Sequence, residues 1–427
     1  MTTVVDRPQA VPAKDEVLAP ISWKLPIIYV LGTLLGVYFA LNADGITQFV
    51  WKDIRPRGGA DLLLHAAPAI WVLVAVMAAA TAYSVVRALK RQHQPLWLGL
   101  LVLMPLILGF LTYSGAGSPR YVTLAFLFSA TLIAAAPLVY GSLAGVVCER
   151  VGVVNIAIEG QLLFGAFTGI IVASAFGSPW LGLIAAPLAG ALIGVLLAFF
   201  SVKYAVDQII VGVVLNVLVL GITSFLLGTV VKANPSWNSI AYSLPVWEIP
   251  LLSQIPFIGP VFFRHTIIMY FLYALIIILT IMLFRSRWGL RMRSVGEHPK
   301  AADTVGINVN RTRFLNTILG SSLAGLGGAA FTIGANAVFT ENISAGNGYI
   351  ALAAMILGKW HPVGAMGAAL MFGFASAIVD FLPLVATNPI DPSLLAMIPY
   401  IVTILAVAGF VGRSRPPAAE NIPYIKS

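Results

Sequence analysis

The sequence has little charge and almost no cysteine. Charged residues make up 10% of its 427 residues, whereas soluble domains have about 25%, and 59% of its residues are hydrophobic. Cys148 is the only cysteine, which excludes an intramolecular disulfide and a cysteine-based metal cluster. The five histidines are scattered, without the spacing of metal ligands or of a catalytic set. We therefore expect a membrane protein that is not an enzyme and binds no metal.

A nucleotide-binding motif is also missing. Gly358-Lys359 lacks the earlier glycine and the following Ser or Thr of a phosphate-binding loop. Gly325, Gly327 and Gly328 match part of a dinucleotide fingerprint but lie inside an apolar run and not after a strand. We expect this chain to bind no cofactor, so that any ATP and Mg²⁺ would be bound by a partner polypeptide.

Long apolar runs are abundant. A bilayer core of about 30 Å requires about 20 apolar residues per helix, and small residues at every fourth position, as in Gly320, Ala324 and Gly328, favour close helix packing. We predict an all-α polytopic membrane protein with about 11 to 12 hydrophobic helices, one of them short, and a cytoplasmic coupling helix. The predicted spans are Leu25–Leu41, Ala67–Val86, Leu96–Tyr113, Tyr121–Val147, Gly160–Phe176, Trp180–Phe200, Val206–Val230, Thr266–Phe284, Phe314–Phe339, Gly364–Phe381 and Leu394–Val411.

The short apolar run is Tyr349–Leu357, which is bounded by glycines and too short to cross a bilayer alone. It is either a half-helix or a short twelfth span. Counting it as a crossing places both termini and most loop cations on the cytoplasmic side. The loop Asn42–His65 is an exception, because its three cations would then lie outside.

These assignments divide the chain into four parts. Residues 1–24 form a cytoplasmic tail without the apolar segment of a signal peptide. Residues 25–120 carry additional N-terminal transmembrane helices, and residues 121–412 form a transmembrane core. Residues 413–427 are a short polar cytoplasmic end.

The basic segment 285–313 lies between two of the long apolar runs. It contains seven cations and two acids, an excess that favours the cytoplasmic side. Within it, Glu297–Val305 has the pattern of a short amphipathic helix that ends at Gly306. We interpret this helix as a lever that another subunit moves. The net charge of +9 comes from such clusters beside apolar runs and does not indicate a nucleic-acid-binding face.

Two stretches resemble a known family. The sequence GEHPKAADTVGIN (296–308), which follows the basic WGLRMRSV, closely resembles the ATPase-coupling loop of ABC import permeases of the ribose and branched-chain amino-acid type. The sequence ERVGVVNIAIEGQLLFGAF (149–167) resembles the nucleoside and simple-sugar members, in which Asn-Ile-x-x-Glu-Gly opens an apolar helix. The resemblance covers about 121–412, and the coupling loop that it implies consists of Gly296, Glu297, Pro299, Lys300, Ala301, Ala302, Val305 and Gly306.

This resemblance implies a permease subunit of an ABC importer, which translocates a nucleoside or a related simple sugar across the cytoplasmic membrane. The implied partners are an ABC ATPase, a second identical or homologous permease chain and an extracytoplasmic solute-binding protein or lipoprotein. A ribose-type, galactose-type or branched-chain amino-acid permease is an alternative. In other classes, an ion-coupled secondary transporter would use a carboxylate such as Glu159 or Asp380, and a scaffold protein would move no solute.

Polar residues within apolar runs are candidates for a translocation path, because inserting them in a membrane costs free energy. Asn155 and Glu159 are four residues apart, so we expect both side chains on one helix face, near the cytoplasmic side. They either border a cavity or bond a neighbouring helix. For Glu159, capping or packing against another helix is the alternative to a role in the path.

Four more amides complete the candidate path. Gln208 and Asn216 are about two turns apart on one helix, and Asn336 and Asn347 lie in the second half. Neutral amides suit a neutral solute with hydroxyl groups or a base, since they donate and accept hydrogen bonds without attracting an ion. The alternative is that Asp207 starts the helix and Asn216 only bonds another helix.

Overall fold

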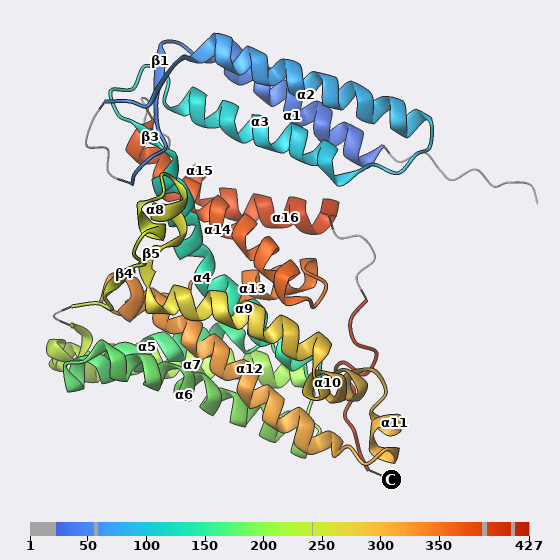
Figure 1. Ribbon diagram of the computed structural model, residues 1–427. Coiled ribbons are helices and arrows are strands. Elements are labelled where there is room, and N and C mark those ends of the chain that lie inside the picture. Colours follow the sequence, from blue (N-terminus) through green and yellow to red (C-terminus); the bar gives the residue numbers. More distant parts are fainter. Residues whose placement is uncertain (1–22, 55–58, 241, 387–390, 411–414, 427) are drawn as a thin grey trace, which may run out of the picture. The chain divides into compact units, whose positions relative to one another are not determined.

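The computed structural model describes residues 23–54, 59–240, 242–386, 391–410 and 415–426. Within this part of the chain, ten helices are long and apolar enough to cross a membrane, which confirms an all-α polytopic membrane protein. The chain divides into two compact units, Met1–Thr47 with Leu64–Gly117 and Gln48–Leu63 with Ser118–Ser427. Figure 1 labels the elements of both units.

The smaller unit contains three helices that pack on one another, α1 (Lys24–Asn42), α2 (Ala66–Leu89) and α3 (Leu96–Ser114). They correspond to the first three predicted spans. Gly36 of α1 lies directly against Met77 of α2, so the two helices approach closely.

The larger unit contains the remaining spans. Its long helices are α4 (Leu124–Glu149), α5 (Ile158–Phe176), α6 (Pro179–Ala198), α7 (Gln208–Leu226), α9 (Ile267–Arg285), α12 (Val309–Phe331) and α14 (Pro362–Val385). Its shorter α-helices are α8 (Ile258–Phe262), α10 (Arg287–Glu297), α11 (Pro299–Thr304), α13 (Asn347–Leu357), α15 (Pro392–Ala396) and α16 (Ile398–Phe410). The 3₁₀ and π turns are η1 (Phe199–Lys203), η2 (Leu227–Val231), η3 (Pro235–Asn238), η4 (Leu252–Gln254) and η5 (Thr332–Asn336).

The strands are few and short. β1 (Ile46–Val50) is the middle strand of a sheet with β2 (Leu62–His65) and β3 (Val122–Thr123), and Phe49 pairs in parallel with Val122. β4 (Val246–Glu248) and β5 (Arg264–Thr266) are antiparallel, with Val246 opposite Thr266.

Helices α4 and α12 lie at the centre of the larger unit. α4 packs on α12, α13 and α14, while α12 packs on α4, α5 and α6. A Cβ at Gly320 would overlap the Cys148 sulfur and the Ala144 carbonyl, and one at Gly328 would overlap the Leu162 carbonyl. These contacts confirm the predicted role of small residues in close helix packing. Gly320 lies against Cys148, and Gly327, further along α12, lies against Tyr140, further back in α4, so the two helices are antiparallel.

The same order of elements occurs twice along the chain. In the first half, α4 is followed by an irregular segment, by α5 and then by α6 and α7. In the second half, α12 is followed by an irregular segment, by α13 and then by α14 and α16. Because α4 and α12 are antiparallel, the two halves run in opposite directions. The starts of α5 and α13 lie together, since Glu159 of α5 accepts a hydrogen bond from the Gly348 N–H of α13.

Two predicted spans differ from the structure. The expected helix Leu394–Val411 is divided into α15 and α16, because Pro399 has no N–H for the Leu395 carbonyl and so prevents α15 from continuing. Its last residue, Val411, lies outside the described residues. The expected Phe314–Phe339 begins earlier, at Val309, and its regular part ends at Phe331 before the π turn η5. α13 has 11 residues, a length of about 16 Å, so it is as short as predicted, and both alternatives for it stay predictions.

Candidate functional site

The segment between α4 and α5 is a loop whose polar groups are buried. Gly152 has a φ of +85°, which favours glycine, and α5 begins only at Ile158. Asn155 therefore lies outside the helix, and the prediction that it shares a helix face with Glu159 is wrong. Its amide instead forms two reciprocal hydrogen bonds of 3.0 Å with the Gln161 amide. Gln161 also donates to the Ser321 hydroxyl at 2.9 Å, so this pair joins the loop to α12.

Glu159 caps the start of α13. Its Oε1 accepts hydrogen bonds from the Ser344 hydroxyl at 2.6 Å and from the Gly346 N–H at 2.8 Å. Its Oε2 accepts one from the Gly348 N–H at 2.6 Å. A carboxylate is favourable here, because the first N–H groups of a helix lack partners within the helix and carry partial positive charge. The geometry is that of the capping alternative, and a role for Glu159 in the path stays a prediction.

Gln208 and Asn216, both on α7, hold the start of α5. Gln208 Oε1 accepts from the Val154 N–H at 2.6 Å, and Asn216 Oδ1 accepts from the Gly160 N–H at 2.8 Å. The Asn216 amide also donates to the Ile156 carbonyl at 2.9 Å and to the Tyr349 hydroxyl at 3.2 Å. Asp207 begins α7 as its N-cap, accepting from two backbone N–H groups as the alternative reading expected.

These contacts bring the first turns of α5 and α13 together. The α5 start is capped from α7, the α13 start is capped from α5, and the Asn216–Tyr349 bond links α7 to α13. Since α13 ends beside Glu149 at the end of α4, this junction lies roughly 16 Å along α13 from that end. It lies well away from the end of α4, and its predicted position near the cytoplasmic side stays a prediction. We call it the helix-start junction, formed by Asn155, Glu159, Gln208, Asn216 and the start of α13.

The two other candidates are less connected. Asn347 is the first residue of α13 and lies half-buried at the helix-start junction, without a side-chain hydrogen bond to any described residue. Asn336, in η5, is exposed and likewise has no such bond within the described residues. The structure thus brings five of the six candidates together and places Asn336 elsewhere.

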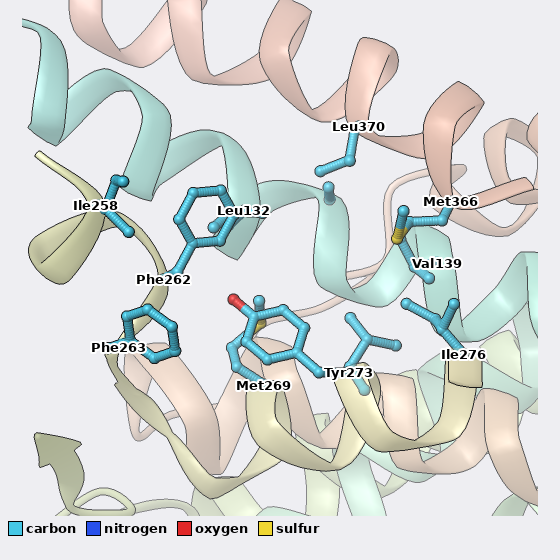
Figure 2. Close-up of a pocket in the computed structure, with 12 residues that line it drawn as sticks. Leu132, Val139, Ile258, Phe262, Phe263, Met269, Tyr273, Ile276, Met366 and Leu370 are labelled. Atoms are coloured by element: carbon cyan, nitrogen blue, oxygen red, sulfur yellow. The ribbon is translucent and has the colours of Figure 1, made fainter. Parts of the chain in front are cut away.

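A separate cavity of about 330 Å³ lies among α4, α8, α9 and α14. Figure 2 shows the rings of Phe262, Phe263 and Tyr273 among aliphatic and methionine side chains around it. The Tyr273 hydroxyl is buried and has no hydrogen-bond partner among the described residues. The other lining side chains offer no polar atom, so this cavity is chemically unsuited to a solute with many hydroxyl groups.

The predicted coupling helix is present in altered form. The basic segment forms α10, which ends at Glu297, and α11 follows after His298. The expected single helix from Glu297 is therefore wrong at its start, because Pro299 cannot donate to the Val295 carbonyl and a new helix begins there. Gly306 has a φ of +85° and follows the end of α11 as predicted.

The coupling-loop residues divide by exposure. Gly296 and Ala302 are buried, and Pro299 is half-buried. The exposed ones are Glu297, Lys300, Ala301, Val305 and Gly306, with Val305 75% exposed. A Cβ at Gly296 would overlap the carbonyl oxygen of Arg150, so α10 ends directly against the chain that follows α4. Val305 is an exposed apolar residue on the same short segment as the cation Lys300, and such a surface is suited to contact with another protein.

Sequence reasoning missed several buried polar residues near the coupling helices. Arg313 was counted as one of the loop cations, but it is 2% exposed. Glu149, 2% exposed, accepts a hydrogen bond from the Trp360 indole N–H at 2.6 Å. His361 stacks on Phe284, and burial lowers its pKa, with the nearby Arg150 lowering it further. An acid or arginine at the end of an apolar run was the only available signal, and it does not distinguish a buried group from an interfacial one.

Comparison with known proteins identifies the family. Residues 127–407 match the family described as "Branched-chain amino acid transport system / permease component". The chain belongs to this permease family. The permease is 43% identical to the guanosine ABC transporter permease protein NupQ of Bacillus subtilis (strain 168) over 313 residues, which cover 71% of this chain and 97% of NupQ.

Two further relatives extend the comparison. The permease is 40% identical to the nucleoside ABC transporter permease protein NupC of Lactococcus lactis subsp. cremoris (strain MG1363), over 71% of this chain and 98% of NupC. It is 29% identical to the putative glucose ABC transporter permease protein TsgC13 of Haloferax volcanii, over 67% of this chain and 92% of TsgC13. No solved structure matches the chain. The resemblance seen in the sequence is confirmed, and the protein is a multi-pass membrane component of a transporter.

Proposed function

We propose that this permease translocates nucleosides into the cell, driven by ATP hydrolysis on a partner subunit. The observation that carries the proposal is its identity of 43% and 40% to NupQ and NupC, over nearly the full length of both relatives. Identity to the putative glucose permease TsgC13 is lower, at 29%. A sugar is therefore the second choice of solute.

The chemistry of the helix-start junction supports a neutral solute. Its Asn347 amide is half-buried and has no side-chain hydrogen bond to a described residue, so it can donate to a solute and accept from it without attracting an ion. The Glu159 carboxylate is already engaged by three donors. Binding a cation there would compete with the cap of α13, which weighs against an ion-coupled carrier that uses this acid.

The proposed partners follow from the family. An ABC ATPase would bind the exposed side of α11 around Lys300, Ala301 and Val305. A second permease chain, identical or homologous, would complete the path, and an extracytoplasmic solute-binding protein or lipoprotein would deliver the solute. With both termini cytoplasmic, α10 and α11 face the ATPase, in agreement with the excess of cations in 285–313.

The proposed mechanism is alternating access. Closure of the ATPases would move α11, and α10 would pass this movement to the end of α4 through the Gly296–Arg150 contact. The helix-start junction lies where α4, α5, α12 and α13 approach one another, so a displacement of α4 changes its surroundings. This chain supplies no bond-breaking chemistry.

Uptake by cells that lack or re-express the permease tests the proposal. Labelled guanosine, adenosine and uridine are supplied with excess ribose, galactose or leucine as competitors, and with the partner ATPase intact or disabled. We expect nucleoside uptake that requires both the permease and the ATPase and that excess ribose, galactose or leucine does not reduce. Competition by a sugar would reassign the solute, and uptake without the ATPase would exclude the ABC mechanism.

A further inference from the structure

The C-terminal tail, residues 415–426, docks against the coupling helices. The Ala419 N–H donates to the Gly296 carbonyl at 2.8 Å, and the Ala418 N–H donates to the Glu297 carboxylate at 3.3 Å. At the other end of the tail, the Lys426 ammonium lies 3.4 Å from the Asp303 carboxylate. Figure 1 shows the C-terminal end of the chain beside α11. The tail thus touches the end of α10, through Gly296 and Glu297, and α11, through Asp303.

The same tail is anchored to α12 by Arg313. The Arg313 guanidinium donates to the Ile422 carbonyl at 2.7 Å and to the Ala419 carbonyl at 3.2 Å. Within the described residues, these tail carbonyls are its hydrogen-bond acceptors, and its Nε has none. A buried charge without partners is costly. Because its partners are carbonyls of the tail, Arg313 favours the docked position over any other.

A third contact joins the tail to α4. The Glu420 carboxyl lies beside the buried Glu149 carboxyl at the end of α4, and Glu149 accepts a hydrogen bond from the Trp360 indole. Two carboxyl groups held together in a buried place disfavour each other's ionisation. The tail therefore reaches α10, α11, α12 and α4 together, and Ala419 in its middle is buried.

We propose that residues 415–426 are a clasp that fixes the coupling helices α10 and α11 to the cytoplasmic ends of α4 and α12. Force applied to α11 then moves both central helices, which head the two antiparallel halves of the core. Without the clasp, α10 and α11 remain attached to the core by the chain on either side, by the packing of α10 on α9 and α12 and of α11 on α12, and by the Gly296–Arg150 contact. The clasp adds the contacts of the tail to these. This inference rests on the proposed function, because it assigns the clasp to the coupling of ATP hydrolysis with transport.

Docking of the tail is tested without any solute. Amide hydrogen exchange of the full-length permease in detergent is compared between the wild type, Arg313→Ala and Arg311→Ala. Arg311 is the matched control, an exposed arginine two residues away on the same helix. We expect protected amides at Ala418 and Ala419 in the wild type and in the control, and exchange at least about tenfold faster in Arg313→Ala. Rapid exchange of these amides in the wild type would overturn the clasp even if nucleoside uptake is confirmed.

Coupling is tested in the assembled transporter in proteoliposomes. The same variants, together with a chain that ends at Arg415, are assayed for ATPase association, ATP hydrolysis and solute uptake. We expect the Arg313→Ala and truncated proteins to bind the ATPase and hydrolyse ATP, while uptake per ATP falls by about tenfold. Arg311→Ala should keep the wild-type ratio. An unchanged ratio with a free tail, or loss of ATPase association instead of coupling, would overturn the proposal.

The two proposals fail in different ways. If the wild type transports a solute other than nucleosides, the proposed substrate is wrong, but the uptake-to-ATP ratio still tests the clasp with that solute. If the tail amides are protected and the ratio stays constant in every variant, the nucleoside proposal stands and the clasp does not.

Discussion

A single carboxylate, the buried Glu159, holds the start of α13. Its three hydrogen bonds satisfy two backbone N–H groups and one hydroxyl that have no other acceptor in the contacts described above. Membrane-spanning structures must satisfy every backbone polar group internally, since lipid offers no partners. Glu159 is therefore best understood as a group that makes the short helix α13 possible, whatever it contributes to the path.

Replacing Glu159 tests this reading. Glu159→Ala leaves the Ser344 hydroxyl and the N–H groups of Gly346 and Gly348 without an acceptor, so we expect the free energy of unfolding to fall by about 3 kcal/mol or more. Glu159→Gln keeps one oxygen acceptor and should be less destabilising. The measurement is unfolding of the purified permease in detergent, followed by intrinsic fluorescence.

Asn336→Ala is the matched control, because Asn336 is exposed and its side chain bonds no described residue. Its stability should stay within about 0.5 kcal/mol of the wild type. A Glu159→Ala protein as stable as the control would show that the cap is dispensable, and a simultaneous loss of uptake would then assign Glu159 to the path.

At the scale of elements, α11 is small and exposed for a helix that is expected to carry force. Lys300 on α11 is exposed, and Val305, directly after its last residue, is 75% exposed. We expect the double variant Lys300→Glu, Val305→Asp to leave insertion and folding unchanged and to lower ATPase binding by about tenfold or more, since it inverts a charge and removes an apolar contact. Co-purification of the ATPase with the permease measures this.

A control of equal exposure separates surface chemistry from coupling. Leu251, 79% exposed in the loop before η4, is replaced by serine. ATPase binding should stay at the wild-type level in Leu251→Ser. Equal binding by the double variant and by this control would show that α11 is not the contact.

The docked tail is an element whose stability should depend on pH. Burial raises the pKa of Glu420 above its ordinary value of 4.5, and the ionisable groups around it are Glu149, whose carboxyl lies beside it, and Arg313, which binds the neighbouring Ala419 carbonyl. The docked state therefore holds the Glu420 proton more tightly than the free tail does. The extra stability that this proton gives the docked tail over the free tail is complete below pH 4.5. It is lost as the pH rises through the raised pKa of Glu420.

We accordingly expect tail amides to exchange faster at pH 7.5 than at pH 5.5, after correction for the intrinsic effect of pH on exchange. Glu420→Gln keeps a hydrogen-bonding side chain without a titrating proton, so its corrected rates should not change over this range. Faster corrected exchange at the lower pH would contradict the raised pKa of Glu420 in the docked tail.

At the scale of the whole molecule, hydropathy was enough to locate the spans, because helix length and apolar composition are set by the bilayer itself. The coupling segment was located by its charge excess. The irregular parts were not predictable in this way. Asn155 was placed on a helix that begins three residues later, at Ile158, and Arg313 looked like any interfacial cation although tail carbonyls bury it. The loop that contains Asn155 is held by the bond from the Val154 N–H to Gln208, and Arg313 bonds the Ile422 carbonyl. Both partners are more than 50 residues away in the sequence, and spacing along one helix carries no information about them.

The residues proposed for the path and for coupling all lie in the larger unit, Gln48–Leu63 with Ser118–Ser427. A chain that begins at Ser118 keeps them but loses the segment 48–63. In this segment β1 pairs with β3, the Lys52 carbonyl accepts a hydrogen bond from the Phe257 N–H, and Asp53 lies 3.4 Å from Arg264. We expect this shortened chain to keep the solute selectivity of the full-length permease and to lose stability around β4, α8 and β5.

Arg264→Ala in the full-length chain serves as the comparison. It removes only the half-exposed ion pair, which is worth about 0 to 1 kcal/mol, so exchange of the β4 and β5 amides should rise less than in the shortened chain. Competition uptake assays measure selectivity, and hydrogen exchange measures the local effect. A shortened chain that inserts correctly but changes its preferred solute would mean that residues 1–117 contribute to the path, and selectivity would then belong to both units.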